Sequence, residues 1–413
     1  MARPRFQADA RAWLAAAALV GLGQQVFVVL RNTYLADRSY SPTVVTSVQG
    51  AGAAAGVVAG LVGLWALRRW PARLALGIGV TANAVGFGIQ VVATSPAAFV
   101  FGAAIAGLGI QGITMSAAPF LARTSTVEER VLLFGIHTIA IQAGPGAIGA
   151  LLGGQIQRAA ASALGSTVGG YRIALAAGAL SVASAWIFLF RVRERRITES
   201  TSAPSGLFRL REPRRALALL APDALVFFGS GLTVPFLQLY FKDRFGLAPA
   251  SVGAIYAAMM FVGGAGHVLS PRLAARFGTP KTILATQLLS LPFFAELLFA
   301  HEASLAIAAF VLRQAMMNMS LPLYGSFLHT SVVDEDSGPV ASYRMIAQSV
   351  AWAAANFVAG PLMAADAGGF RYVIAATMAT YVAAIAVGAI VYPRFGREPT
   401  GSMVRGSEVI ARP

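Results

Sequence analysis

This chain contains twelve long apolar stretches, and each is long enough to cross a membrane as a helix. A helix needs about 20 mainly apolar residues to cross the hydrocarbon core of a bilayer. Composition agrees, because 57% of the residues are hydrophobic and 12% are charged, whereas a soluble domain has about 25% charged residues. We therefore predict an all-α membrane protein with twelve transmembrane helices. The predicted spans are 12–34, 44–67, 74–95, 97–121, 131–155, 171–191, 216–241, 249–271, 280–300, 303–329, 342–364 and 370–393.

The 32 basic residues lie unevenly around these spans. With the N-terminus inside, 24 fall on the inner side and six in outer loops, while Arg31 and Arg313 lie within spans. Cytoplasmic loops are enriched in Lys and Arg, so we predict that both termini are cytoplasmic. The net charge of +15 is then explained by the basic loops that set the topology. We expect no nucleic-acid partner, because no basic surface has interleaved aromatic residues. The apolar stretch after the basic N-terminus is too long for a signal peptide, which indicates a retained first span.

A polar segment separates two sets of six spans. The stretch from Arg191 to Arg215 holds eight arginines together with Thr, Ser and Pro, which is typical of a solvated linker. We predict an N-terminal six-helix bundle over 1–191, a cytoplasmic linker over 192–215, a C-terminal six-helix bundle over 216–393 and a cytoplasmic tail over 394–413.

The two halves repeat each other in sequence. The segment 34–38 (Tyr-Leu-Ala-Asp-Arg) matches 240–244 (Tyr-Phe-Lys-Asp-Arg), and 124–129 matches 330–335 at the same offset of 206 residues. Gly144-Pro145 in span 5 resembles Gly360-Pro361 in span 11. Six spans followed by the same six indicate a parallel repeat about an axis along the membrane normal.

Two loops and one span resemble motifs of a known family. The loop after span 8, Pro271 to Lys281, is similar to the signature loop G-x-L-A-D-R-x-G-R-[RK] of the major facilitator superfamily, and the loop after span 2 is a weaker copy. Leu67 and Ala275 stand where that family has Asp. The Gly144-Pro145 pair resembles the Gly-Pro motif of the family's antiporters, although Ala103 replaces an arginine of the drug-antiporter pattern.

The resemblance implies two six-helix bundles that rock about a central cavity. In that fold spans 1, 4, 7 and 10 line the cavity, and the expected state is a monomer in the lipid bilayer. The partners implied are a small-molecule substrate and a coupling ion, which we expect to be a proton.

Ionisable groups inside a bilayer are costly, so each is a candidate for function. Arg313 lies near mid-depth in span 10, and its guanidinium suits a carboxylate or phosphate; the alternative is a structural arginine bonded to carbonyls or amides. Arg31 lies near the outer end of span 1, where snorkelling or pairing with Asp37 is the expected role and substrate binding is the alternative. The uncharged candidates for substrate binding are Gln24, Gln111, Gln142, Gln238, Asn318, Tyr324 and Trp352.

Proton coupling needs a titratable group in the pathway. Asp223, two turns into span 7, and His137 in span 5 are the candidates, with a helix-cap-like aspartate and a packing histidine as alternatives. For gating we expect cross-half ion pairs among the inner loops, together with the Gly144-Pro145 motif; the alternative for the loop charges is a solvated charged face. The loop residues predicted to gate are Arg68, Arg276, Glu128 and Asp334.

The leading functional hypothesis is proton-coupled efflux of amphipathic, drug-like compounds across a bacterial inner membrane. One alternative is an organic-anion symporter, exchanger or uniporter that uses Arg313, and another is a carrier-like sensor that transports nothing. The chain has no cysteine, its four histidines lack metal-site spacing, and it has no Walker loop or Ser-His-Asp arrangement. We therefore expect no cofactor, no metal and no enzymatic activity.

Overall fold

The computed structural model describes residues 6–66, 70–192, 210–366 and 369–395, and within these it is almost entirely helical. The first half contains α1 to α8 and the second half α9 to α15. The helices are α1 (Ala8–Asp37), α2 (Pro42–Ala66), α3 (Ala72–Val92), α4 (Pro96–Arg123), α5 (Val127–Thr138), α6 (Pro145–Leu164), α7 (Thr167–Ser184), α8 (Trp186–Leu189), α9 (Pro213–Thr233), α10 (Leu237–Phe245), α11 (Pro249–Phe277), α12 (Thr279–Phe299), α13 (Ala303–Ser331), α14 (Asp334–Ala365) and α15 (Arg371–Phe395).

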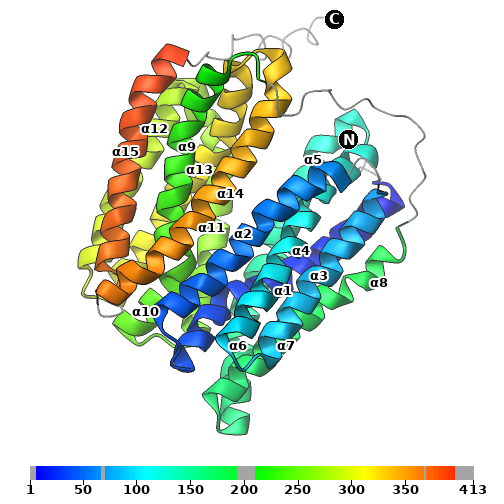
Figure 1. The fold of residues 1–413 in the computed structure, drawn as a ribbon, viewed down its shortest axis with the longest axis vertical. Helices are drawn as coiled ribbons and strands as arrows, with labels where there is room; N and C mark the ends of the chain where they lie inside the picture. Colours follow the sequence, from blue (N-terminus) through cyan, green and yellow to red (C-terminus); the bar gives the residue numbers. More distant parts are fainter. Residues whose placement is uncertain (1–5, 67–69, 193–209, 367–368, 396–413) are drawn as a thin grey trace, which may run out of the picture.

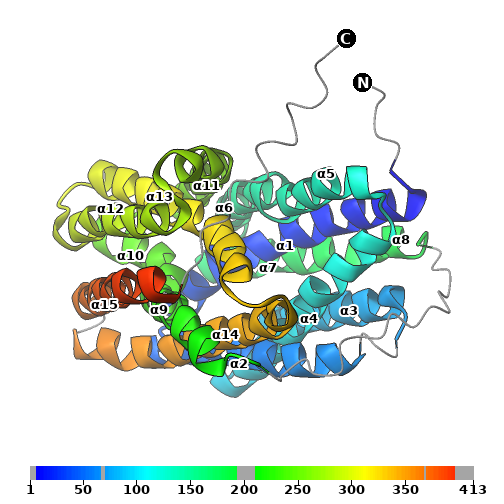
Figure 2. The same cartoon turned by 90° about the horizontal axis from the view of Figure 1, so that it is seen from above.

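The two halves stand side by side and meet along two pairs of helices. α2 packs against α14, and α6 packs against α11, as seen from above in Figure 2. α1 begins and α15 ends at one end of the bundle, which we call the termini face (Figure 1). The halves converge at the other end, the opposite face, where α10 and the end of α1 lie (Figure 1).

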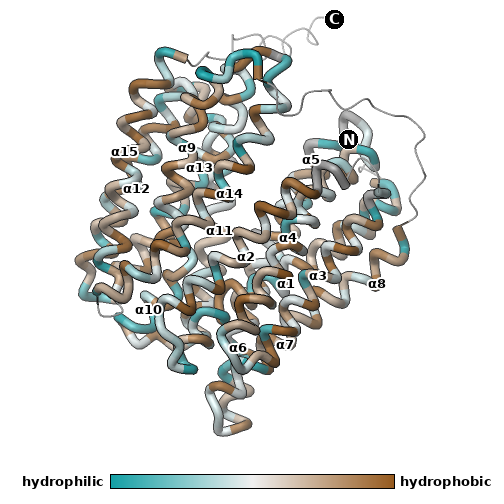
Figure 3. The backbone as a smooth tube through the Cα atoms, viewed as in Figure 1, coloured by the Kyte–Doolittle hydropathy of each residue, from teal (hydrophilic) through white to brown (hydrophobic). Residues whose placement is uncertain are grey.

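The surface of the described helices suits lipid. Figure 3 shows hydrophobic residues along the helices and hydrophilic ones mainly at their ends. Large apolar side chains are exposed on the outside, among them Val92 at 72% and Leu180 at 69%. Eleven helical segments of the described chain are long and apolar enough to cross a membrane. α14, with 32 residues, is not among these segments, and its first turns carry Asp334, Glu335, Asp336 and Arg344. The all-α fold with its membrane-spanning helices is thus confirmed.

Two of the predicted spans contain breaks. Span 5 is interrupted by a π-helical turn, Ile139–Ala143, directly before Gly144 and Pro145. Span 7 is interrupted by a 3-10 turn, Val234–Phe236, between α9 and α10. Proline lacks the N–H that a regular helix needs, so Pro145 and Pro235 account for the places where the regular hydrogen bonding changes.

The sequence repeat has a counterpart in three-dimensional contacts. Arg38 donates a hydrogen bond to the carbonyl of Ala93, the C-cap residue directly after α3 (2.8 Å). Arg244 donates in the same way to the carbonyl of Ala300, which ends α12 (2.6 Å). Each guanidinium also lies over the ring of a tyrosine four residues earlier. Arg38 and Arg244 are 206 residues apart and their acceptors Ala93 and Ala300 are 207 apart, so equivalent residues make the same contact in each half.

Glycines at the two interfaces between the halves also follow this repeat. A Cβ on Gly154 of α6 would lie 2.4 Å from the carbonyl oxygen of Pro249, and one on Gly360 of α14 would lie 3.0 Å from Cα of Thr43. Gly360 follows Gly154 by 206 residues, and Pro249 follows Thr43 by the same number. Gly360 is therefore the counterpart of Gly154, and the sequence pairing of Gly360-Pro361 with Gly144-Pro145 is wrong.

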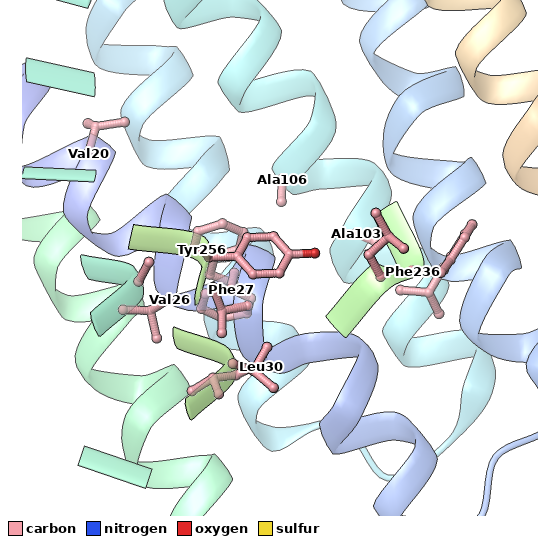
Figure 4. Packing of buried hydrophobic residues seen from close by; sticks show 14 of the residues in the cluster. Val20, Val26, Phe27, Leu30, Ala103, Ala106, Phe236 and Tyr256 are labelled. Atoms are coloured by element: carbon pink, nitrogen blue, oxygen red, sulfur yellow. The ribbon is translucent and has the colours of Figure 1, made fainter. Parts of the chain in front are cut away.

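The apolar core joins the halves near the opposite face. Figure 4 shows Val26, Phe27 and Leu30 of α1 in one cluster with Phe236 and Tyr256 of the second half. Phe27 stacks on Phe87 of α3, with ring centroids 3.6 Å apart and planes within 7°. This packing fixes α1 between the two halves, so its polar side chains take defined positions at the cavity described next.

Candidate functional site: a central cavity

A cavity of about 320 Å³ lies between the halves. This volume is at the lower end of the range of about 300–1,000 Å³ typical of small-molecule sites. A smaller hollow of about 30 Å³ adjoins it, shares Gly56, Gln111 and Ser349 with it, and is otherwise lined by residues such as Met115 and Met345. The described residues that line the main cavity are Gln24, Phe27, Val28, Arg31, Gln49, Gly52, Ala53, Gly56, Asn83, Phe87, Ala103, Ala106, Gly107, Ile110, Gln111, Phe227, Gln348, Ser349 and Trp352.

The two halves contribute different chemistry to this cavity. α1 to α4 supply its one charged residue and four of its five side-chain amides. α9 and α14 supply the aromatic pair Phe227 and Trp352, whose ring centroids are 6.3 Å apart, together with Gln348 and Ser349. A molecule in the cavity therefore meets the charge and most of the amides on the side of the first half, and aromatic rings from both halves, because Phe27 and Phe87 also line it.

Arg31 is the charged residue of the lining. Among the described residues its side chain has no hydrogen bond or ion pair, and its Nε atom is buried without a partner. The expected pairing with Asp37 is wrong, since Asp37 forms an ion pair with Lys242. Snorkelling to the headgroups is not what the structure shows either, because the side chain faces the cavity between the halves.

Asp223 lies immediately behind the cavity wall in the second half and is 6% exposed. Its Oδ2 atom accepts hydrogen bonds from Arg344 Nε (3.0 Å) and Gln348 Nε2 (2.6 Å). Arg344 and Gln348 share one face of α14 because they are four residues apart. Gln348 also lines the cavity, so one amide connects the cavity to a buried carboxylate. The arginine guanidinium lies over the ring of Tyr324, 4.7 Å from its centroid.

Polar contacts join the halves at the opposite face. Asn32 Nδ2 donates to the carbonyl of Pro235 (2.7 Å), and Gln238 Nε2 donates to that of Val28 (3.3 Å). The Lys242–Asp37 ion pair connects the same two helical segments farther along. The opposite face is thus held shut by bonds between α1 and the broken span 7.

Sequence and fold comparisons decide what kind of protein builds this arrangement. A sequence model of the major facilitator superfamily matches residues 13–222 and again 223–409. The chain belongs to the major facilitator superfamily. The two matches cover the two halves in turn, as the repeat predicts, and the resemblance found in the loops is confirmed. No curated protein matches the chain significantly in sequence.

Solved structures of this superfamily share the fold. A bacterial homologue of the human lysosomal transporter Spinster, in an inward-facing, occupied conformation, superposes with a TM-score of 0.75 at 15% identity, covering 94% of this chain and 96% of that one. A D-xylose–proton symporter gives a TM-score of 0.72 at 17% identity, covering 94% and 98%. The POT family transporter PepTSo gives a TM-score of 0.75 at 12% identity, covering 95% of this chain and 99% of that one. As a superfamily member the chain is a multi-pass membrane transporter that binds small molecules.

Three of the predicted substrate residues meet in the transporter's cavity, namely Gln24, Gln111 and Trp352. Others lie elsewhere in the described part of the chain. Gln238 holds the halves together at the opposite face. Asn318 accepts a hydrogen bond from Gln314 (3.0 Å), and the hydroxyl of Tyr324 donates to the carbonyl of Leu219. The backbone of Gln142 belongs to the π-helical turn, and its side chain lies outside the described part.

Arg313 does not line the cavity. It is 1% exposed and lies inside the second half of the transporter, where Nη2 donates to the hydroxyl of Tyr381 (2.6 Å). Nη1 donates to Gln314 Oε1 (2.9 Å), and the guanidinium lies 4.5 Å from the ring centroid of Phe294. The Tyr381 hydroxyl also bonds Ser230. Arg313 thus connects α13 with α12 and α15, which is the structural alternative considered for it.

The predicted coupling histidine and gating residues occupy other places. The ring of His137 packs 5.9 Å from that of Trp13, outside the cavity lining. Arg276 is exposed and lies over Phe277 at 5.3 Å. Arg68 and the side chains of Glu128 and Asp334 lie outside the described residues. Gly144 and Pro145 follow the π-helical turn directly, and their predicted role in gating stays a prediction.

Sequence reasoning missed the partner of Asp223. Arg344 lies at the start of the predicted span 342–364 and counts there only among the basic residues of the inner side. The helix begins earlier, at Asp334, so Arg344 lies about three turns inside it and faces Asp223. The available signal was the spacing of Arg344 and Gln348, which puts two donors on one helix face.

Proposed function

We propose that this transporter exports a small organic solute by proton antiport and that Asp223 carries the coupling proton. The observation that carries the proposal is the bond between Asp223 and Gln348, since Gln348 also lines the cavity. A solute that engages Gln348 changes the surroundings of the carboxylate, and a proton on the carboxylate changes those of the amide. Binding of either one therefore alters the free energy of binding the other.

Charge neutralisation explains how a proton would act here. The Asp223 carboxylate pairs with Arg344 in a low-dielectric setting, where loss of one partner's charge is expensive. A proton on Asp223 removes the negative charge and weakens the pair, so Arg344 and Gln348 are free to move with α14. α14 packs against α2 of the other half, so this motion reaches the interface between the halves.

Orientation and direction follow from charge and motif. We assign the termini face to the cytoplasm, because 24 of the 32 basic residues fall on that side of the spans. With the opposite face closed by the α1 contacts, the structure then corresponds to an inward-facing state in a bacterial inner membrane. The break at Gly144-Pro145, similar to that of the family's antiporters, supports export.

Proton flux in proteoliposomes tests the proposal. An imposed pH gradient and an internal pH-sensitive dye would be used with a lipophilic cation, a neutral amphiphile and an aromatic carboxylate. We expect at least one solute to trigger proton movement opposite to its own. Asp223→Asn should abolish that proton movement while retaining solute exchange, because asparagine keeps the hydrogen-bond geometry and cannot ionise.

Glu296→Gln is the matched control, since Glu296 lies in a predicted span but does not line the cavity. Proton movement that persists in Asp223→Asn would show that another group carries the proton. Solute and protons moving in the same direction would overturn export by antiport. A solute that binds but never crosses the vesicle membrane would instead favour a sensor.

A further inference from the structure

The charge of the cavity lining is unbalanced. Arg31 is the only ionisable residue among the described residues that line it. Asp37, which lies in the same helix as Arg31, is already paired with Lys242 of the second half. Asp223 is paired with Arg344. A cation inside a membrane protein is costly without an anionic partner, so the cavity lacks the counter-charge that Arg31 requires.

The geometry points to Arg31 as the residue that binds the acidic group of the substrate, which we infer to be a small aromatic organic anion. The guanidinium supplies a planar set of N–H donors that match a carboxylate, sulfonate or phosphate. The amides of Gln24 and Gln111, on the same wall, add donors and acceptors for further polar groups. This inference rests on the proposed transport function and specifies its substrate class.

The aromatic rings of the lining determine the rest of the molecule. Phe227 and Trp352 of the second half, together with Phe27 and Phe87 of the first, surround the cavity, and aromatic faces favour a flat apolar partner. Gly52, Ala53, Ala103 and Gly107 leave space between the walls because their side chains are small. A cation of the same shape would meet Arg31 with no acid in the lining to offset it.

The expected solute is then an anion in place of a generic drug-like compound. The residue that binds the anion is Arg31 and not Arg313. Arg313 is enclosed by Phe294, Tyr381 and Gln314, whereas Arg31 lies open to the cavity. Of Arg31 and Arg313, only Arg31 is therefore placed to meet a solute.

Ligand-induced thermal stabilisation of the purified protein tests the inference without requiring transport. Three probes share one ring system and differ in charge: naphthalene-1-carboxylate, naphthalene-1-methanol and 1-naphthylmethylammonium. A ligand that binds only the folded state raises the unfolding temperature, and at equal concentration a tighter ligand raises it more, with the logarithm of its affinity. We expect the carboxylate to stabilise the protein and the ammonium compound not to do so.

Variants assign the effect to Arg31. Arg31→Gln should weaken carboxylate binding about 10- to 100-fold, as for loss of a hydrogen bond to a charged group. Arg31→Lys should retain part of the affinity, because it keeps the charge and loses the planar donors. Arg158→Gln, which removes an exposed charge on α6, is the matched control and should bind as the unaltered protein does.

Several results would overturn the inference. They are equal stabilisation by the carboxylate and ammonium probes, no stabilisation by the carboxylate at millimolar concentration, or unchanged carboxylate affinity in Arg31→Gln. The charge series on the unaltered protein remains decisive even if a variant fails to fold. A lysophospholipid with an anionic headgroup forms a further arm: stabilisation by it alone, lost in Arg31→Gln, would reject the small aromatic anion.

The outcome is separable from that of the proposed coupling. Carboxylate binding through Arg31 without proton movement in vesicles would support this inference and reject proton antiport. Proton movement driven by a neutral or cationic solute, with no role for Arg31, would do the reverse.

Discussion

Arg313 and Arg31 show how two similar residues acquire different roles. Both are arginines within apolar spans, and one faces packed rings while the other faces a cavity. The position of a residue along a span predicts its depth in the membrane, because each residue of a helix adds a fixed rise. It does not predict which way the side chain points, since that depends on how neighbouring helices pack. Asp223 could be singled out as a buried acid within a span, but its partner Arg344 belongs to another helix.

Substitution of Arg313 should affect stability and spare solute binding. Arg313→Gln removes the bond to the Tyr381 hydroxyl and the contact with the Phe294 ring, so we expect a loss of about 1.5–3 kcal/mol in the free energy of unfolding. Thermal unfolding in detergent measures it. Tyr381→Phe, which removes the hydroxyl shared by Arg313 and Ser230, should lower stability in the same direction. If Arg313→Gln unfolds normally yet loses carboxylate binding, Arg313 has a role in the site that its packing does not reveal.

At the scale of helices, the spans could be predicted and their breaks could not. Apolar length is a strong signal, so every predicted span coincides with a helical segment. Prolines alone do not locate the breaks in spans 5 and 7, because Pro119 and Pro292 lie inside unbroken helices, and the π-helical turn depends on local backbone bonding that composition does not encode. The Gly360 pairing failed because a dipeptide match carries little information, whereas contacts between helices identified Gly154 as the counterpart.

The close contact at Gly154 should help to set the balance between conformations. A Cβ there meets the backbone of Pro249 at 2.4 Å, so in Gly154→Ala α6 and α11 must separate at the opposite face. Overpacking costs about 1–3 kcal/mol, which corresponds to about a fivefold or larger shift toward the state with the opposite face open.

Distances between spin labels would measure this shift. The chain has no cysteine, so Ser162→Cys on α6 and Ala248→Cys before α11 can be labelled without further changes. Gly88→Ala is the matched control, because a Cβ at Gly88 meets no atom within 4 Å. Identical distance distributions in Gly154→Ala and Gly88→Ala would contradict the expected role of this contact.

For the whole molecule, the two-half architecture and the closed opposite face make a prediction about topology. Both termini should be cytoplasmic, because the basic residues accumulate on their side of the spans. A fluorescent protein fused to either end should fluoresce in cells, and a phosphatase that matures only outside the cytoplasm should remain inactive there. Active phosphatase at either end would reverse the orientation and would turn the conformation described here into an outward-facing one.

The division of the cavity between two halves has a consequence for which molecules can be carried rather than merely held. Arg31 belongs to the first half, whereas Phe227 and Trp352 belong to the second, so an anion must reach across the cavity to contact both halves. An anion too short to touch Phe227 or Trp352 is held by the first half alone and contributes nothing to drawing the two together. Molecular length would then act as a filter on the moving step itself, and small inorganic anions could occupy the site without being transported.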